Sequence, residues 1–206
     1  WIPSMHTVLS IEFFNNIYEL STFTSEKFVN IHLAGLMTIC ELFYLQKQLP
    51  QIQIQANGIT ELIQQKYLVQ SSEEYQDKLT ELLKLFIQQQ WARFVNQPEF
   101  SSKEFLLHLF KFTFTDSASA LTFAERLYLW IPIMKSFDEK MAPRYTETVI
   151  QLISNVIVKM QFQRNFELLD VLDTEELDEN METELQTFRN NCIEVILTAA
   201  EMEPLK

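Results

Sequence analysis

The feature that most constrains the fold of this chain is its shortage of glycine, since only two glycines occur in 206 residues. Glycine makes up about 7% of an average protein. Sheets, barrels and nucleotide-binding folds use it in tight turns and where the backbone approaches a phosphate closely. The shortage therefore disfavours these folds and favours helices joined by short polar loops. Hydrophobic residues make up 47% of the chain, so these helices have a core to bury and the chain is not disordered.

Apolar residues recur with helical spacing in several segments. The clearest stripe runs from Tyr145 to Met160, and similar stripes run from Tyr75 to Phe86 and from Leu185 to Met202. Together with residues that start or stop helices, these stripes predict about eight helices. They cover roughly residues 4–20, 26–48, 56–69, 73–96, 101–115, 118–140, 143–162 and 182–203.

The predicted helices pair in chain order into units of about 40 to 50 residues, which is the length of HEAT-type repeats. We therefore predict an all-α fold, a HEAT-type α-α superhelix of about four antiparallel helix pairs. The units would span about 1–50, 51–97, 98–141 and 142–206. Because the chain begins at Trp1 with an apolar run close behind, we expect it to be a segment of a longer protein.

Two local signals make sharper predictions. Pro132 lies inside the predicted 118–140 helix, where it should remove the hydrogen bond to the carbonyl of Tyr128 and kink the helix. Ser71 stands three residues before Glu74, which is the spacing of a capping box at the start of a helix.

The net charge of −12 restricts the partners of the chain. It disfavours nucleic acid and anionic membranes and favours a partner with a basic face. No apolar run approaches the ~20 residues of a membrane span. Acidic residues concentrate in a predicted inter-helix loop over residues 166–184, which contains no lysine or arginine. Such a loop is either a solvated linker or an electrostatic docking segment for a basic partner.

No catalytic arrangement is visible in the sequence, which lacks a glycine-rich phosphate loop and the GxSxG and HExxH motifs. His6, His32 and His108 are scattered, and Cys40 and Cys192 lie far apart. We predict that His32 and His108, which lie in apolar helical runs, are structural and that both thiols are buried and reduced. We expect no catalytic residue, no metal site and no cofactor.

Four large or charged side chains leave alternatives open. Trp91 and Trp130 suit either the core or a partner interface, and their helical phase favours the core. Arg126 and Lys135 either face the concave surface of the superhelix or lie on a solvated helix face.

Several segments together resemble a known family. The first match combines Phe105–Phe114 with Leu127–Trp130. The second match combines Val158–Phe162, Leu172–Glu179, Glu182–Glu184 and Phe188–Cys192. Over roughly residues 70–205, the chain resembles exportins of the importin-β (karyopherin) superfamily.

The resemblance implies a nuclear export receptor that shuttles between nucleus and cytoplasm. Receptors of this family are long HEAT solenoids that bind Ran-GTP together with a protein cargo, here expected to be actin–profilin, and touch FG-repeat nucleoporins. It also implies that the acidic loop contacts the basic surface of Ran. The candidate partner contacts are Asp173, Glu175, Glu176, Asp178 and Glu179. GTP hydrolysis would belong to Ran, so this chain would need no catalytic residue.

Two other classes of protein compete with this interpretation. A HEAT-repeat scaffold or adaptor without GTPase coupling would share the fold and the charge. An enzyme would require turnover that depends on a specific carboxylate. Binding of GTP-loaded Ran by the whole receptor distinguishes an exportin from a scaffold.

Overall fold

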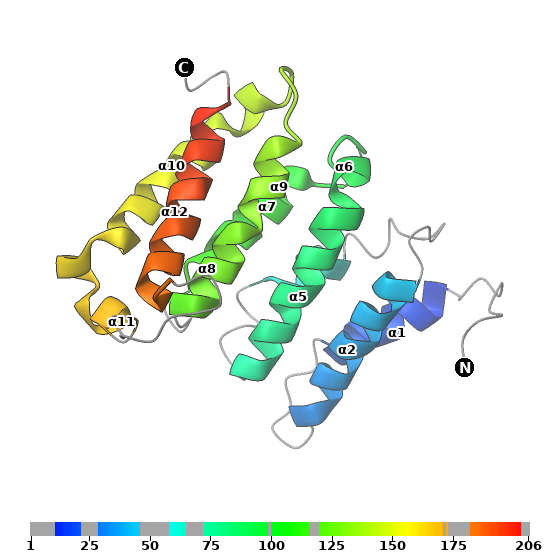
Figure 1. Ribbon diagram of the computed structural model, residues 1–206. Coiled ribbons are helices and arrows are strands. Elements are labelled where there is room, and N and C mark those ends of the chain that lie inside the picture. Colours follow the sequence, from blue (N-terminus) through cyan, green and yellow to red (C-terminus); the bar gives the residue numbers. More distant parts are fainter. Residues whose placement is uncertain are drawn as a thin grey trace. The chain divides into compact units, whose positions relative to one another are not determined.

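A computed structural model describes residues 11–21, 29–45, 58–64, 72–98, 100–115, 120–170, 172 and 182–202. Every regular element in these ranges is a helix, which confirms the all-α class (Figure 1). The chain divides into two compact units, with the boundary after Ser102. This boundary lies close to the predicted limit between the second and third helix pairs. The division into four repeat units stays a prediction.

The first compact unit is organised around one central helix. Its helices are α1 (Ile11–Ser21), α2 (Val29–Leu45), α5 (Glu73–Gln89) and α6 (Trp91–Phe94), with a further helical turn over residues 58–62. The central helix α2 packs against both α1 and α5 (Figure 1). Because neighbours cover two of its sides, apolar residues dominate α2, and Leu36, Ile39 and Cys40 are buried. Of the predicted 56–69 helix, residues 58–62 are helical and residues 63 and 64 form a turn, and the other residues of that range lie outside the described residues.

Both glycines of the chain lie where helices of the first unit approach one another closely. A Cβ atom added to Gly35 on α2 would lie 2.7 Å from the Ser21 Oγ at the end of α1. A Cβ atom added to Gly58 would lie 2.8 Å from ring carbons of Tyr18. At these two positions glycine provides space between helices and not a turn, which agrees with the helical fold that the glycine shortage predicts.

Helix α5 begins at Glu73, where the predicted 73–96 helix begins, but its N-cap differs from the prediction. The hydroxyl of Ser72 caps the helix by accepting a hydrogen bond from the Tyr75 backbone N at 3.2 Å, and the predicted capping residue, Ser71, lies outside the described residues. The predicted apolar stripe is confirmed. Its members are all buried: Tyr75, Leu79, Leu82, Leu83 and Phe86.

The predicted 73–96 helix is interrupted at Gln90, whose φ of −128° is not helical. The interruption separates α5 from α6 and accompanies an aromatic cluster. The ring centroids of Phe86 and Phe94 are 6.0 Å apart, and those of Trp91 and Phe100 are 6.1 Å apart in an edge-to-face arrangement. Trp91 is 1% exposed, so the predicted core position is confirmed. Aromatic packing of this kind adds stability beyond the area that it buries.

The second compact unit is organised around its last helix. Its helices are α7 (Ser102–Thr113), α8 (Ala120–Tyr128), α9 (Trp130–Lys135), α10 (Ala142–Met160), a 3₁₀ turn (Phe162–Arg164), α11 (Phe166–Asp170) and α12 (Glu184–Ala200). The last helix, α12, packs against α8, α9 and α10 (Figure 1). Its predicted stripe is confirmed, since Leu185, Phe188, Cys192, Val195, Ala199 and Met202 are all buried.

The predicted 118–140 helix is broken in the way that Pro132 predicts. The first part, α8, ends at Tyr128, whose carbonyl would have accepted the hydrogen bond that proline cannot donate. The second part ends at Lys135, so the last predicted helical residues form a loop. In this loop the Asp138 Oδ1 accepts hydrogen bonds from the backbone N of Lys140 at 3.0 Å and of Met141 at 2.8 Å, which leads the chain into α10.

Two side chains join α8 and α9 to α7. The Trp130 Nε1 donates to the Thr113 Oγ1 at 3.0 Å, and burial of Trp130 confirms its predicted core position. The Arg126 side chain is also buried, so both surface positions considered for it from the sequence are wrong. Its Nη1 donates to the Phe112 carbonyl at 3.1 Å, and its guanidinium carbon lies 4.0 Å from the centre of the Phe112 ring. A carbonyl acceptor and a ring face make this buried position possible for a cation.

Candidate partner-binding surfaces

The predicted acidic partner contacts lie outside the described residues, but their flanks are described. The five residues are Asp173, Glu175, Glu176, Asp178 and Glu179. Before them lies the short helix α11, and Leu169 and Leu172 are buried. After them, the backbone N of Leu185 donates to the Leu172 carbonyl at 3.2 Å. We call the part of the loop that contains these five residues the acidic segment. Its two flanks are therefore joined at the first turn of α12.

A second acidic surface, which was not predicted, lies between α2 and α5, and we call it the α2–α5 groove. Its volume is about 490 Å³, and it is lined by Leu33 and Met37 from α2 and by Glu73, Glu74, Asp77, Lys78 and Glu81 from α5. Acidic residues three or four positions apart on α5 share one helix face, so their spacing was a usable signal in the sequence. The apolar residues that complete the groove come from a helix far away in the sequence.

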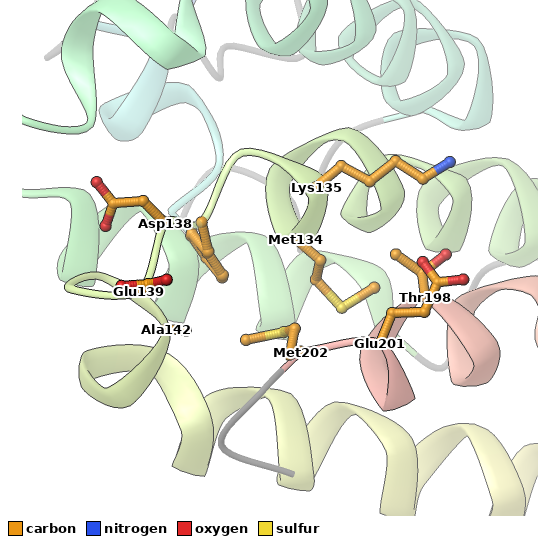
Figure 2. A pocket seen from close by; sticks show the side chains of 9 residues that line it. Met134, Lys135, Asp138, Glu139, Ala142, Thr198, Glu201 and Met202 are labelled. Carbon is orange, nitrogen blue, oxygen red and sulfur yellow. The ribbon is translucent and has the colours of Figure 1, made fainter. Parts of the chain in front are cut away.

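A smaller pocket lies in the second unit, with a volume of about 290 Å³. Figure 2 shows Met134 of α9 and Met202, just beyond α12, in the middle of its lining, with the charged side chains of Lys135, Asp138 and Glu201 around them. Both methionines are buried. Methionine adapts its shape readily, so this pocket suits a small apolar side chain. Lys135 is exposed at the pocket, which agrees with either of its predicted surface positions.

The outward sides of α10 and α12 expose large apolar residues. On α10 the predicted stripe is confirmed for Tyr145, Val149, Leu152 and Val156, which are buried, whereas Ile157 is 46% exposed. On α12, Ile193 is 45% exposed and Leu197 is 59% exposed. Both helices therefore carry more apolar surface than their contacts within this unit cover.

No candidate catalytic or metal centre emerges in the part of the chain that the structure describes. There, no group of three or more histidine, cysteine or acidic side chains is placed to hold a metal ion. The His108 Nε2 lies 3.9 Å from the Glu104 Oε1, one helical turn away. His6 lies outside the described residues, and His32 lies on α2. Over the same ranges, no helix combines the length and the apolar character needed to cross a membrane.

The two cysteines are buried free thiols, as predicted. Burial raises the pKa of Cys192 from its ordinary value of 9.0 to about 12. Burial also raises the pKa of Cys40 to about 12, and the negative charge of Glu81 adds to the effect. A thiol that stays protonated is a poor nucleophile and a poor metal ligand.

The described helices pack through apolar faces and define this chain as an all-α protein, which is consistent with the helical solenoid that the sequence predicts. Its sequence is similar to exportin-6 of Danio rerio, with 28% identity over 174 residues that cover 80% of this chain and 15% of the relative. It is 27% identical to exportin-6-B of Xenopus laevis over 82% of this chain and 15% of the relative. It is 29% identical to exportin-6 of Homo sapiens over 66% of this chain and 13% of the relative.

The resemblance to exportins is thereby confirmed. The chain spans about 13–15% of the length of these curated relatives. No protein-family model matches the chain, and no solved structure is significantly similar to it.

Proposed function

We propose that this chain is a segment of a nuclear export receptor that moves between nucleus and cytoplasm. The observation that carries the proposal is the similarity to exportin-6 from several animals over most of the chain. The helical fold and the net charge of −12 support it, because both suit a surface that binds proteins with basic faces. The part assigned to this chain is binding, and no catalytic step is assigned to it.

The proposed partners are Ran-GTP, a protein cargo, here actin–profilin, and FG-repeat nucleoporins. Binding would be cooperative, because Ran-GTP and cargo each favour the same conformation of the receptor and therefore each raise the affinity for the other. The acidic segment is the proposed contact with Ran. The hydrogen bond between Leu185 and Leu172 supports this role, since it fixes both flanks of the segment to a packed helix. Hydrolysis of GTP would take place on Ran.

The test is binding of GTP-loaded Ran to the full-length receptor, with and without actin–profilin, over a range of salt concentrations. One variant changes Asp173, Glu175, Glu176, Asp178 and Glu179 to the neutral amides. A matched control changes the same number of exposed carboxylates of the second unit outside the acidic loop to amides: Glu104, Glu125, Glu139, Glu147 and Glu201. Both variants lose the same net charge, so a difference between them reports the position of the carboxylates.

We expect cargo to strengthen Ran binding, and we expect only the acidic-segment variant to weaken it and to reduce its salt dependence. If both variants bind Ran as the wild type does, the acidic segment is a solvated linker. If the receptor does not bind GTP-loaded Ran, the export function is wrong and a HEAT-repeat scaffold without GTPase coupling replaces it.

A further inference from the structure

The α2–α5 groove combines an open cavity with an apolar floor and a charged side. Leu33 and Met37 are one helical turn apart on α2, so their side chains lie on the same face of that helix. Met37 is 48% exposed although it is fully apolar. The volume of about 490 Å³ lies within the range of about 300–1,000 Å³ typical of ligand pockets. The groove therefore has room for a side chain of a partner on its floor.

The charged side chains of the groove are mostly acidic. The ammonium of Lys78 lies 2.6 Å from the Glu81 carboxylate, so these two charges offset each other. Glu73, Glu74 and Asp77 are exposed, and within the described residues none of them forms an ion pair. The groove thus presents three carboxylates and one lysine–glutamate ion pair beside its apolar floor.

Helix stability alone explains only part of this arrangement. Glu73 and Glu74 lie in the first turn of α5, where negative charge interacts favourably with the helix dipole. Asp77 lies beyond the first turn, where that effect has faded. The exposed half of the Met37 side chain adds nothing to the core of the first unit. A binding surface accounts for the charge of Asp77 and for the exposure of Met37. Stabilisation of the start of α5 accounts for neither.

We infer that the α2–α5 groove binds a basic segment of a partner protein, with an apolar side chain of that segment placed on Met37 and Leu33. Charge complementarity identifies the occupant, because lysine or arginine side chains on either side of the apolar anchor would meet the three carboxylates. A second copy of this chain is a poor occupant, since its net charge is −12. The groove lies in the first unit and the residues of the proposed Ran contact belong to the second, so this inference does not rest on the export function.

The test uses the 206-residue chain and a short fluorescent helical peptide made of leucine and lysine, with binding followed by fluorescence anisotropy. Two further peptides serve as probes, one with serine in place of leucine and one with glutamate in place of lysine. The charge variant combines Glu73→Gln, Glu74→Gln and Asp77→Asn. Its matched control combines Glu125→Gln, Glu139→Gln and Glu147→Gln, three exposed carboxylates of the second unit outside the acidic loop.

The floor of the groove is tested separately. The floor variant is Met37→Ser, and its control is Leu107→Ser on α7, where the leucine is 52% exposed. Circular dichroism and urea unfolding establish that each variant is folded before binding is compared. Comparison of each groove variant with its control distinguishes a specific loss of binding in the groove from a general effect of charge or of apolar surface.

We expect the leucine–lysine peptide to bind saturably at low salt. The charge variant should weaken this binding about tenfold, because three exposed charge contacts are lost. The floor variant should weaken it about fivefold through lost apolar contact. Each control should change it by less than about twofold. The serine and glutamate peptides should bind much more weakly.

Three results would overturn the inference. Equal weakening by a groove variant and its control would show that the peptide responds to overall charge or surface. Equal binding of the leucine–lysine and serine–lysine peptides would show that the apolar floor has no role. Lack of saturable binding to the folded chain would show that the groove is not a binding site. Loss of Ran binding in the full-length receptor would leave all three results unaffected.

Discussion

The two compact units join their helices through different kinds of buried polar contact. In the first unit the contact is between neutral groups, since the Tyr75 hydroxyl of α5 donates to the Ser21 carbonyl of α1 at 2.9 Å. In the second unit a cation is buried, and Arg126 donates to the Phe112 carbonyl. A neutral hydroxyl that loses its partner costs less than a buried cation does. The second unit should therefore be the more sensitive of the two to changes at its polar contact.

The largest effect should come from Arg126→Ala. This substitution removes a fully buried side chain, its stacking on Phe112 and its hydrogen bond. We expect a loss of about 3 kcal/mol in the free energy of unfolding, measured by urea denaturation. The matched variant Arg126→Met keeps most of the side-chain volume and should lose about half as much. Equal losses in the two variants would show that packing is unimportant at this position.

Substitution of a glycine should rank next and falls in the first unit. In Gly35→Ala the new Cβ would lie 2.7 Å from the Ser21 Oγ, so α1 and α2 must separate or distort. We expect a loss of about 1–3 kcal/mol in the free energy of unfolding. Adding Ser21→Ala removes the nearest atom, so the double variant should lose less than the sum of the two single variants. Simple additivity in this double-mutant cycle would contradict the proposed clash.

The neutral hydrogen bonds of the two units can be compared directly with two conservative substitutions. Tyr75→Phe removes only the hydroxyl that donates to Ser21, and Trp130→Phe removes the indole N–H that donates to Thr113. We expect a loss of about 1 kcal/mol for Tyr75→Phe and somewhat more for Trp130→Phe, because a smaller ring also leaves space. A loss from Tyr75→Phe that exceeds that from Arg126→Ala would reverse the ranking of the two units.

The smallest effect at neutral pH concerns the buried thiols. In the folded state the pKa of Cys192 is raised from 9.0 to about 12. Below pH 9 the thiol is protonated in both states and stability is unaffected; as the pH rises toward 12, only the unfolded state loses the proton, so stability falls. Cys192→Ala should therefore reduce the alkaline loss in the free energy of unfolding, measured between neutral pH and about pH 10. An unchanged alkaline loss would show that other groups cause it.

Much of the fold could be predicted from the sequence because the apolar residues of a packed helix recur every three or four positions. The stripe from Tyr75 to Phe86 and the break before Pro132 follow from spacing and from proline chemistry, and both are confirmed. The capping box of Thr183 and Gln186 had a readable signature that was missed; there the Gln186 backbone N donates to the Thr183 Oγ1 at 3.2 Å and the Thr183 backbone N donates to the Gln186 Oε1 at 2.8 Å.

Contacts between distant segments could not be predicted in the same way. Arg126 looked like a surface residue because no local pattern shows that a carbonyl and a ring from α7 surround it. The α2–α5 groove was missed for the same reason, since Met37 lies thirty-six or more positions from the carboxylates that face it. The proposed Ran contacts stay a prediction, because they fall outside the described residues.

Each compact unit contains one cysteine, Cys40 in the first and Cys192 in the second, and both are buried. A thiol-specific reagent reacts with the exposed thiolate, so modification of either residue requires its surroundings to open first. The labelling rate of each cysteine therefore reports how often its own unit opens. Mass spectrometry of partly labelled protein can measure both rates in one sample. Equal labelling rates would mean that the two units open as one cooperative body, and unequal rates would give the opening rate of each.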